Sequence, residues 1–177
     1  MTARLARMAD AAAIAAIYND GIADRVATFE TVMRSPAEIE GWFADALPLI
    51  VVEDAAQVLG FARASSYRDR ACYAGIGEFS VYVARAARGQ GVGRLALMTL
   101  IDASERAGFW KLLSRIFVEN HASRALVARC GFREVGVYRC HGRLDGAWRD
   151  VVIVERLLGS AASEAARRNV TGPEMPS

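Results

Sequence analysis

The sequence predicts a single α/β (α+β) domain in which helices cover both faces of a mixed, mostly antiparallel central sheet. Short β-rich runs alternate with segments of helical hydrophobic periodicity, which is typical of that class. The runs 49–52 and 58–62 flank a polar turn, so they are expected to pair as an antiparallel hairpin. A chain of 177 residues without an internal repeat has the length of one domain.

The N-terminal part is expected to contain a short strand and two helices. The strand covers residues 4–6, and Asp10 is a suitable N-cap for a helix that continues to about residue 20. The second helix begins at Ser35-Pro36-Ala37-Glu38, where a capping box is combined with proline at the first helical position. The hairpin described above follows these helices.

The C-terminal part continues the alternation of strands and helices. Residues 79–83 are rich in β-branched and aromatic side chains and predict a strand, and the helix after the glycine-rich loop ends at Gly108 as its C′ residue. Residues 159–177 show no core pattern and predict a disordered tail, so the folded domain is expected to span residues 1–158. The remaining expected elements are a strand over 110–118, a helix over 122–130, and strands over 132–139 and 148–157 joined by the turn Leu144-Asp145-Gly146.

Composition and charge exclude several classes of protein. Lys plus Arg number 22 and Asp plus Glu number 20, so the net charge of +2 gives no broad field for nucleic acid or an anionic membrane. The three cysteines, Cys72, Cys130 and Cys140, show no paired spacing, and two histidines are too few for an ordinary zinc site. No run approaches the ~20 apolar residues of a membrane-spanning helix. We therefore expect a cytoplasmic protein without a metal.

The segment 88–93 is the strongest candidate binding motif. Gly89, Gly91 and Gly93 can adopt positive φ and let backbone amides approach a ligand, and the helix that follows adds its positive dipole end. Arg88 and Arg94 flank these amides with positive charge. The alternative is a loop that needs glycine only for tight turns. A dinucleotide fingerprint over 91–96 is disfavoured, because Lys111 and Leu112 stand where its acidic residue belongs.

The run Arg88-Gly89-Gln90-Gly91-Val92-Gly93 resembles the acyl-CoA pyrophosphate loop of the GNAT superfamily of N-acetyltransferases. The resemblance spans about residues 2–158 and is greatest for the phosphinothricin and arsinothricin acetyltransferase branch. It implies a GNAT-like fold, acetyl-CoA as cosubstrate, an amino-acid acceptor and a homodimer. The other matching stretches are Ile17-Tyr18-Asn19, Ala27-Thr28-Phe29-Glu30, Arg70-Ala71-Cys72-Tyr73, Glu78-Phe79-Ser80-Val81-Tyr82-Val83, Glu119-Asn120, Ala122-Ser123, Cys130-Gly131-Phe132 and Gly146-Ala147-Trp148-Arg149-Asp150.

The resemblance implies roles for residues on the cofactor side of the site. Glu78 matches the catalytic glutamate of the branch, whereas from the sequence alone an exposed glutamate at a strand start is the competing interpretation. The backbone of Val81 and Val83 would polarise the thioester and pair with pantetheine. Asn120 matches a cofactor-contacting asparagine but is equally suited to be a helix N-cap. Val127 stands where the family often has tyrosine or histidine, so no side-chain general acid is assigned.

The resemblance also implies an acceptor site. Arg68, Arg70 and Tyr73 lie in a segment like the R-x-x-Y substrate element of the branch, where two guanidinium groups could bind a carboxylate or phosphonate-like anion. On spacing alone, a solvated basic loop is the alternative. Phe29 would form a pocket wall, and Glu30 would be a partner for the acceptor's ammonium group.

These observations favour an enzyme over two alternatives. The expected reaction is direct acetyl transfer from acetyl-CoA to the α-amino group of a small L-amino acid or analogue of the phosphinothricin, methionine sulfoximine or arsinothricin type. A non-catalytic CoA-binding regulatory domain is the alternative, but it would not need a base, an arginine pair and a tyrosine together. A dehydrogenase would require the disfavoured dinucleotide fingerprint.

Overall fold

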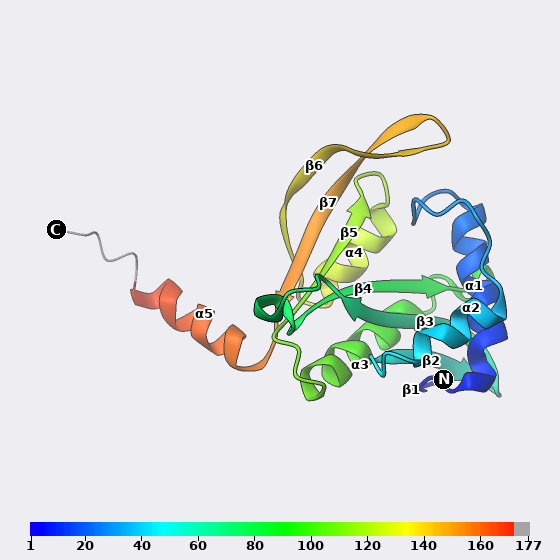
Figure 1. Ribbon diagram of the computed structural model, residues 1–177, viewed down its shortest axis with the longest axis horizontal. Helices are drawn as coiled ribbons and strands as arrows, with labels where there is room; N and C mark the ends of the chain where they lie inside the picture. Colours follow the sequence, from blue (N-terminus) through cyan, green and yellow to red (C-terminus); the bar gives the residue numbers. More distant parts are fainter. Residues whose placement is uncertain (172–177) are drawn as a thin grey trace.

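A seven-stranded sheet forms the centre of the computed structural model, which describes residues 1–171 (Figure 1). Its strands are β1 (Thr2–Leu5), β2 (Leu49–Asp54), β3 (Gln57–Ser66), β4 (Ile76–Val83), β5 (Lys111–Phe117), β6 (Arg133–Leu144) and β7 (Ala147–Leu157). They lie in the order β1-β2-β3-β4-β5-β7-β6, and every neighbouring pair is antiparallel except β4 and β5. The predicted mixed, mostly antiparallel sheet is confirmed.

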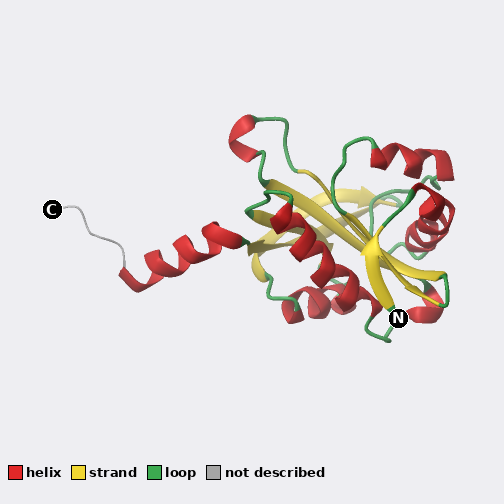
Figure 2. Ribbon diagram, turned by 90° about the horizontal axis from the view of Figure 1, so that it is seen from below, coloured by secondary structure: helices red, strands yellow, loops and turns green. Residues whose placement is uncertain are grey.

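Helices cover both faces of this sheet (Figure 2). The α-helices are α1 (Ala11–Ala23), α2 (Pro36–Glu40), α3 (Val92–Arg106), α4 (His121–Arg129) and α5 (Gly159–Thr171). One face packs against α1 and α2 through Ile14, Ile39, Phe61 and Tyr82, and the other packs against α3 through Leu97, Leu100, Phe79 and Leu112. Burying each large apolar side chain contributes about 1.5–3 kcal/mol, so these two clusters stabilise the arrangement of the strands.

The sheet divides at its only parallel strand pair among the described residues. β4 pairs with β5 only where Ile76, Gly77 and Glu78 lie opposite Lys111, Leu112 and Leu113. Beyond this point β4 remains paired with β3 as far as Val83, and β5 remains paired with β7 as far as Phe117. The two halves of the sheet therefore separate after Glu78, and the facing edges of β4 and β5 have no strand between them.

Local hydrogen bonds explain where the first helices begin. The Ser35 hydroxyl accepts from the Glu38 amide at 3.3 Å, and the Glu38 carboxylate accepts from the Ser35 amide at 2.7 Å, which confirms the predicted capping box. Asp10 stands at the N-cap of α1, but its carboxylate accepts from the Arg7 amide and from Arg4 instead of capping α1. The hydrogen bonds from Arg4 lower the pKa of Asp10.

The C-terminal segment differs from the prediction. Residues Gly159–Thr171 form α5, which projects away from the sheet (Figure 1), so the expectation of disorder is wrong over this range. Its alanine-rich composition has high helix propensity, and Glu164 pairs with Arg167 and Arg168 three and four residues later. A core pattern was therefore not needed for helix formation. Residues 172–177 of the predicted tail lie outside the described residues.

None of the helices in residues 1–171 is long and apolar enough to cross a membrane.

Gly60 allows the first turn of α3 to pack closely on β3. A Cβ atom at this position would lie 2.8 Å from Val92 Cγ1 and 2.9 Å from the backbone oxygen of Tyr82. Because the backbone oxygen cannot rotate away, we expect Gly60→Ala to lower the free energy of unfolding by about 1–3 kcal/mol. Urea denaturation measures this effect. Gly41→Ala is the control, because nothing lies within 4 Å of a Cβ there, and equal midpoints for the two variants would contradict the packing argument.

Candidate active site

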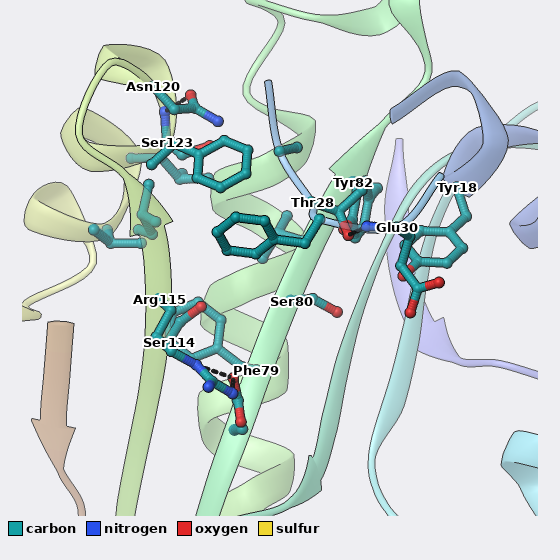
Figure 3. Close-up of a pocket in the computed structure, with 18 of the residues that line it drawn as sticks. Tyr18, Thr28, Glu30, Phe79, Ser80, Tyr82, Ser114, Arg115, Asn120 and Ser123 are labelled. Atoms are coloured by element: carbon teal, nitrogen blue, oxygen red, sulfur yellow. Dashed lines mark hydrogen bonds and ion pairs between the residues drawn. The ribbon is translucent and has the colours of Figure 1, made fainter. Parts of the chain in front are cut away.

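A cavity of about 650 Å³ opens where β4 and β5 separate (Figure 3). It is bounded by the two strands, the loop after α1 and the start of α4. Its lining residues are Tyr18, Ala27, Thr28, Phe29, Glu30, Thr31, Val32, Glu78, Phe79, Ser80, Val81, Tyr82, Ser114, Arg115, Ile116, Phe117, Asn120, Ser123, Leu126, Val127 and His141.

Alternation along the strands gives the cavity two chemically different sides. Phe79, Val81 and Val83 pack into the apolar cluster beneath α3, so the predicted core role of the Val81 and Val83 side chains is consistent with their packing. Glu78, Ser80 and Tyr82 alternate with them and therefore lie on the opposite face of β4, where Tyr82 packs with α1. The polar side chains of β4 are thus presented to one side of the cavity, while Leu126 and Val127 of α4 line it on the apolar side.

Glu78 is the last β4 residue that is paired with β5. Its side chain is 25% exposed, and it forms an ion pair with Arg115 of β5. Arg115 Nε donates to Glu78 Oε1 at 3.0 Å, and Nη2 donates to the same oxygen. Among the described residues no donor is bound to Oε2, so this oxygen is the atom through which Glu78 can accept a proton.

The loop between α1 and α2 covers the cavity with Phe29 and Glu30. The Phe29 ring packs edge-to-face on Phe117, with 4.8 Å between ring centroids, and the His141 ring lies 6.4 Å from it. Glu30 Oε1 accepts from Arg34 Nη2 at 2.9 Å. The structure therefore places Phe29 and Glu30, which were predicted to contact the acceptor substrate, in the cavity, but the Glu30 carboxylate already has an ionic partner.

Two asparagines hold this loop against the rest of the fold. Asn19 of α1 accepts from the Arg34 amide at 2.8 Å and donates to the Arg34 carbonyl at 2.9 Å. Asn120 caps α4 by accepting from the Ser123 amide at 3.0 Å, and its Nδ2 donates to the Val26 carbonyl at 2.9 Å. The N-cap role of Asn120 is thus present, and the same side chain connects the loop to α4.

Asn19→Leu removes both hydrogen bonds to Arg34 while keeping a side chain of similar size. We expect the acceptor KM to rise about 10-fold, because each lost hydrogen bond costs about 0.5–1.5 kcal/mol and the loop that carries Phe29 becomes less ordered. Binding of acetyl-CoA, measured by calorimetry, should not change. Gln57→Leu, an exposed change at the start of β3, is the control, and an unchanged acceptor KM in Asn19→Leu would contradict this positioning role.

A tyrosine pair closes the end of the cavity nearest α1. Tyr18 and Tyr82 pack edge-to-face with 4.7 Å between centroids. Burial raises the pKa of Tyr82. Tyr82 therefore remains a neutral phenol at physiological pH and can act as a hydrogen-bond donor.

The glycine turn leads directly into the N-terminus of α3. Gly89 and Gly91 have φ values of 76° and 85°, and nothing lies within 4 Å of a Cβ at either position. The hydrogen bond from the Leu95 amide to the Gly91 carbonyl, at 3.0 Å, closes the first turn. The amides of residues 92–94 precede it and have no helical acceptor. Open space, left-handed glycines and free amides together fit a diphosphate.

The side chains around this turn have different partners. Gln90 Nε2 donates to the Ala86 carbonyl at 2.8 Å, which stabilises the turn, and a Cβ at Gly93 would lie 3.2 Å from Leu126 of α4.

Arg88 Nη2 lies 2.6 Å from the Asp24 carboxylate. Hydrogen bonds from Arg85 and then from Arg88 lower the pKa of the Asp24 carboxyl. Arg94 is exposed on the first turn of α3, and Val92 is buried. The charge of Arg88 is therefore directed to the end of α1, which differs from the expected flanking position.

The predicted anion-binding group lies elsewhere. Arg68, Arg70 and Tyr73 are on the loop between β3 and β4, and none of them lines the cavity. Each arginine instead stacks near a tyrosine of that loop, Arg68 at 5.2 Å from the ring of Tyr67 and Arg70 at 5.9 Å from that of Tyr73. The lining of this cavity therefore does not support their role in binding the acceptor's anion, which stays a prediction.

Sequence reasoning missed two cavity residues, Arg115 and His141. Arg115 lies two residues beyond Leu113, which is opposite Glu78, so only the strand register reveals its proximity. His141 belongs to no motif of the sequence. It lies in a bulge of β6, where the Asp150 carboxylate accepts from the Cys140 amide at 2.7 Å and Cys140 has a φ of 48°.

No cysteine lines the cavity in the described part of the chain. Cys130 is buried at the end of α4, and burial raises the pKa of its thiol, which makes it a poor nucleophile. Cys72 and Cys140 are exposed outside the cavity. Val127 does line the cavity, and its side chain can neither donate nor accept a proton.

The chain is similar to characterised acetyltransferases over most of its length. Residues 14–132 match the model of the acetyltransferase (GNAT) family. A phosphinothricin N-acetyltransferase of Alcaligenes faecalis is 38% identical over 164 residues, which covers 90% of this chain and 83% of that protein. An L-methionine sulfoximine/L-methionine sulfone acetyltransferase of Pseudomonas paraeruginosa is 32% identical over 165 residues, covering 90% of this chain and 96% of that protein.

Solved structures agree with these relatives. A GNAT superfamily phosphinothricin acetyltransferase from Sinorhizobium meliloti, determined in complex with acetyl-CoA, superimposes with a TM-score of 0.84 at 30% identity and covers 92% of this chain and 90% of that one. The family match, the relatives and the divided sheet lead to the same conclusion: this chain belongs to the GNAT family of acetyltransferases.

Proposed function

We propose that this protein transfers the acetyl group of acetyl-CoA directly to the α-amino group of a small L-amino acid of the phosphinothricin or methionine sulfoximine type. The observation that carries the proposal is the position of Glu78. Its carboxylate lies at the point where β4 and β5 separate, and Glu78 lines the cavity there together with residues of α4. The substrates named for the relatives support this acceptor class.

The chain's own residues supply binding and proton transfer. Bound acetyl-CoA supplies the thioester, and the amides of residues 89–94 would hold its diphosphate, with Asn120 at the start of α4 beside it. The edge of β4 at Val81 and Val83 lacks a partner strand on the β5 side, so its amides are available to pantetheine and to the thioester oxygen. Arg94 would add positive charge at the diphosphate.

Proton transfer begins at Glu78. An amino acid's ammonium group is mostly protonated at neutral pH, so Glu78 Oε2 would accept a proton, directly or through water, before the amine attacks. The amine nitrogen then forms a bond to the thioester carbonyl carbon while the carbon–sulfur bond breaks. The sulfur leaves as a thiolate and takes up, through water, the second proton that the nitrogen loses on forming the amide, since a thiol pKa is ~8.5 and Val127 cannot donate a proton.

A panel of acceptors tests this function. Free thiol released from acetyl-CoA would be measured with phosphinothricin, methionine sulfoximine, methionine sulfone, arsinothricin and ordinary L-amino acids, and products would be identified by mass spectrometry. We expect N-acetylated product with at least one analogue and the highest kcat/KM in that group. CoA binding without thiol release from any acceptor would instead favour a regulatory CoA-binding domain.

We also propose that the protein is a cytoplasmic homodimer. Support for the dimer comes from the β6–β7 hairpin, which extends beyond the body of the sheet (Figure 1) and exposes Val135, Val137, Tyr138 and Trp148 by about half of their surfaces each. Three free cysteines support a reducing compartment. Sedimentation velocity should give twice the chain mass, whereas a monomer at micromolar concentration would contradict the dimer.

A further inference from the structure

Arg115 is the only lysine or arginine that lines the cavity within the described residues. The other lining groups that carry or can carry charge are Glu30, Glu78, His141 and the two tyrosines. The arginines expected to bind the acceptor's anion, Arg68 and Arg70, lie on the loop between β3 and β4 and do not line this cavity. An acceptor anion that enters the cavity therefore meets one permanent positive charge.

The strand register fixes where that charge lies. Leu113 is opposite Glu78 in the parallel pair, and Arg115 follows it by two residues, so its side chain is on the same face of the sheet as Glu78. Figure 3 shows Arg115 on β5 at the wall of the cavity. Its side chain is 43% exposed, compared with 25% for Glu78, so a ligand in the cavity can reach the guanidinium group.

The guanidinium group retains binding capacity beyond its ion pair. Nε and Nη2 both donate to Glu78 Oε1, and the ion pair does not use Nη1. Arg115 thus differs from Arg34, which is the nearest basic partner of Glu30 but is divided between Glu30 and Glu38 at 2.9 and 3.0 Å. A planar guanidinium that is fixed on one edge is well suited to hold a carboxylate on another.

The ion pair is complementary to an α-amino acid. In such a molecule the ammonium and carboxylate groups are bonded to the same carbon atom, so they present opposite charges side by side. The Glu78 carboxylate and the Arg115 guanidinium likewise present opposite charges side by side, joined through Glu78 Oε1. An acceptor that places its nitrogen at Glu78 therefore brings its carboxylate to Arg115.

We propose that Arg115 binds the α-carboxylate of the acceptor and makes the site selective for α-amino acids over simple amines. This proposal rests on the proposed function, because it assumes that the acceptor's amine lies at Glu78. It assigns to β5 the anion recognition that the sequence had suggested for the loop before β4.

The test compares two acceptors that differ only in the carboxylate. One is the preferred amino-acid substrate, for example L-methionine sulfoximine, and the other is the amine that lacks only its α-carboxylate. For Arg115→Leu we expect the KM of the amino acid to rise about 10- to 100-fold, the range for loss of a charge-assisted hydrogen bond. The KM of the amine should stay within about twofold, so the preference for the amino acid collapses.

Two further variants complete the test. Arg115→Lys keeps the charge but not the planar fork, and it should restore part of the preference. Arg133→Leu removes an exposed arginine whose partner, Glu155, is also bound by Lys111, so both acceptors should behave as with the unaltered enzyme. Circular dichroism and thermal melting would verify that each variant is folded.

The outcomes separate this proposal from the function on which it rests. Equal loss of kcat/KM for both acceptors in Arg115→Leu would overturn the proposal and leave Arg115 as a residue that only positions Glu78. A preference for the amino acid that survives in Arg115→Leu would also overturn it, while acetylation of amino acids by the unaltered enzyme would still support the function. An unaltered enzyme that acetylates neither acceptor would overturn both.

Discussion

Replacing Glu78 by glutamine is expected to lower kcat at neutral pH by about 100-fold or more, the contribution of a positioned general base. Glutamine has the same shape and keeps an oxygen that can accept from Arg115, so the ion-paired corner of the cavity should retain its geometry. It cannot accept a proton from the acceptor's ammonium group. Steady-state thiol release between pH 6 and 10 measures the loss.

The pH profile distinguishes loss of a base from damage to the site. If Glu78 acts as the base, the activity of Glu78→Gln should recover as the pH approaches the pKa of the amine, because free amine then needs no base. Glu134→Gln is the control, since Glu134 forms an exposed ion pair with Arg124 outside the cavity. We expect the affinity for acetyl-CoA to be unchanged in Glu78→Gln and in Glu134→Gln. If Glu78→Gln turned over as fast as the unaltered enzyme, Glu78 would have no role in the mechanism.

A side chain at Gly91 is expected to weaken acetyl-CoA binding by about 10-fold or more, equivalent to ~1.4 kcal/mol. Gly91 is the N-cap of α3 and has a φ of 85°, which a β-branched residue adopts only with strain of about 1–3 kcal/mol. Gly91→Val relieves that strain by shifting the turn, so the amides of residues 92–94 no longer converge on a diphosphate. Isothermal titration calorimetry with CoA measures the change in Kd.

Gly146→Val is a matched control for Gly91→Val. Gly146 has a φ of 79° in the β6–β7 turn and, like Gly91, has nothing within 4 Å of a Cβ position. Both variants should lose similar stability in thermal melting, but only Gly91→Val should lose CoA affinity. Equal CoA affinity in the two variants would show that the turn does not hold the diphosphate.

Local sequence signals predicted the elements that depend on local chemistry. The capping box at Ser35 and Glu38 formed because both partners lie within one helical turn. The turn at Leu144-Asp145-Gly146 formed because Asp145 and Gly146 can adopt positive φ, at 49° and 79°. Gly108, with a φ of 89°, follows the end of α3 for the same reason.

Features that depend on contacts between distant segments were not predictable in the same way. Arg115 is 37 residues from Glu78 in the chain, and only the parallel register of β4 and β5 brings them together. The bulge of β6 places His141 at the cavity, and this bulge is held by the Asp150 carboxylate of the neighbouring strand β7. Arg68 and Arg70 lie on the loop between β3 and β4, outside the cavity. Periodicity and capping contain no information on any of these.

The proposed mechanism requires that acetyl-CoA held at the glycine turn reaches the cavity at Glu78, and a bisubstrate conjugate tests this most directly. The conjugate has the α-nitrogen of the preferred amino acid linked to the sulfur of CoA through an acetyl bridge, and its inhibition is measured against each substrate. We predict competitive inhibition against both acetyl-CoA and the amino acid, with an affinity at least about 100-fold above that of either. Competition with only one of the two substrates would contradict a shared cavity between β4 and β5.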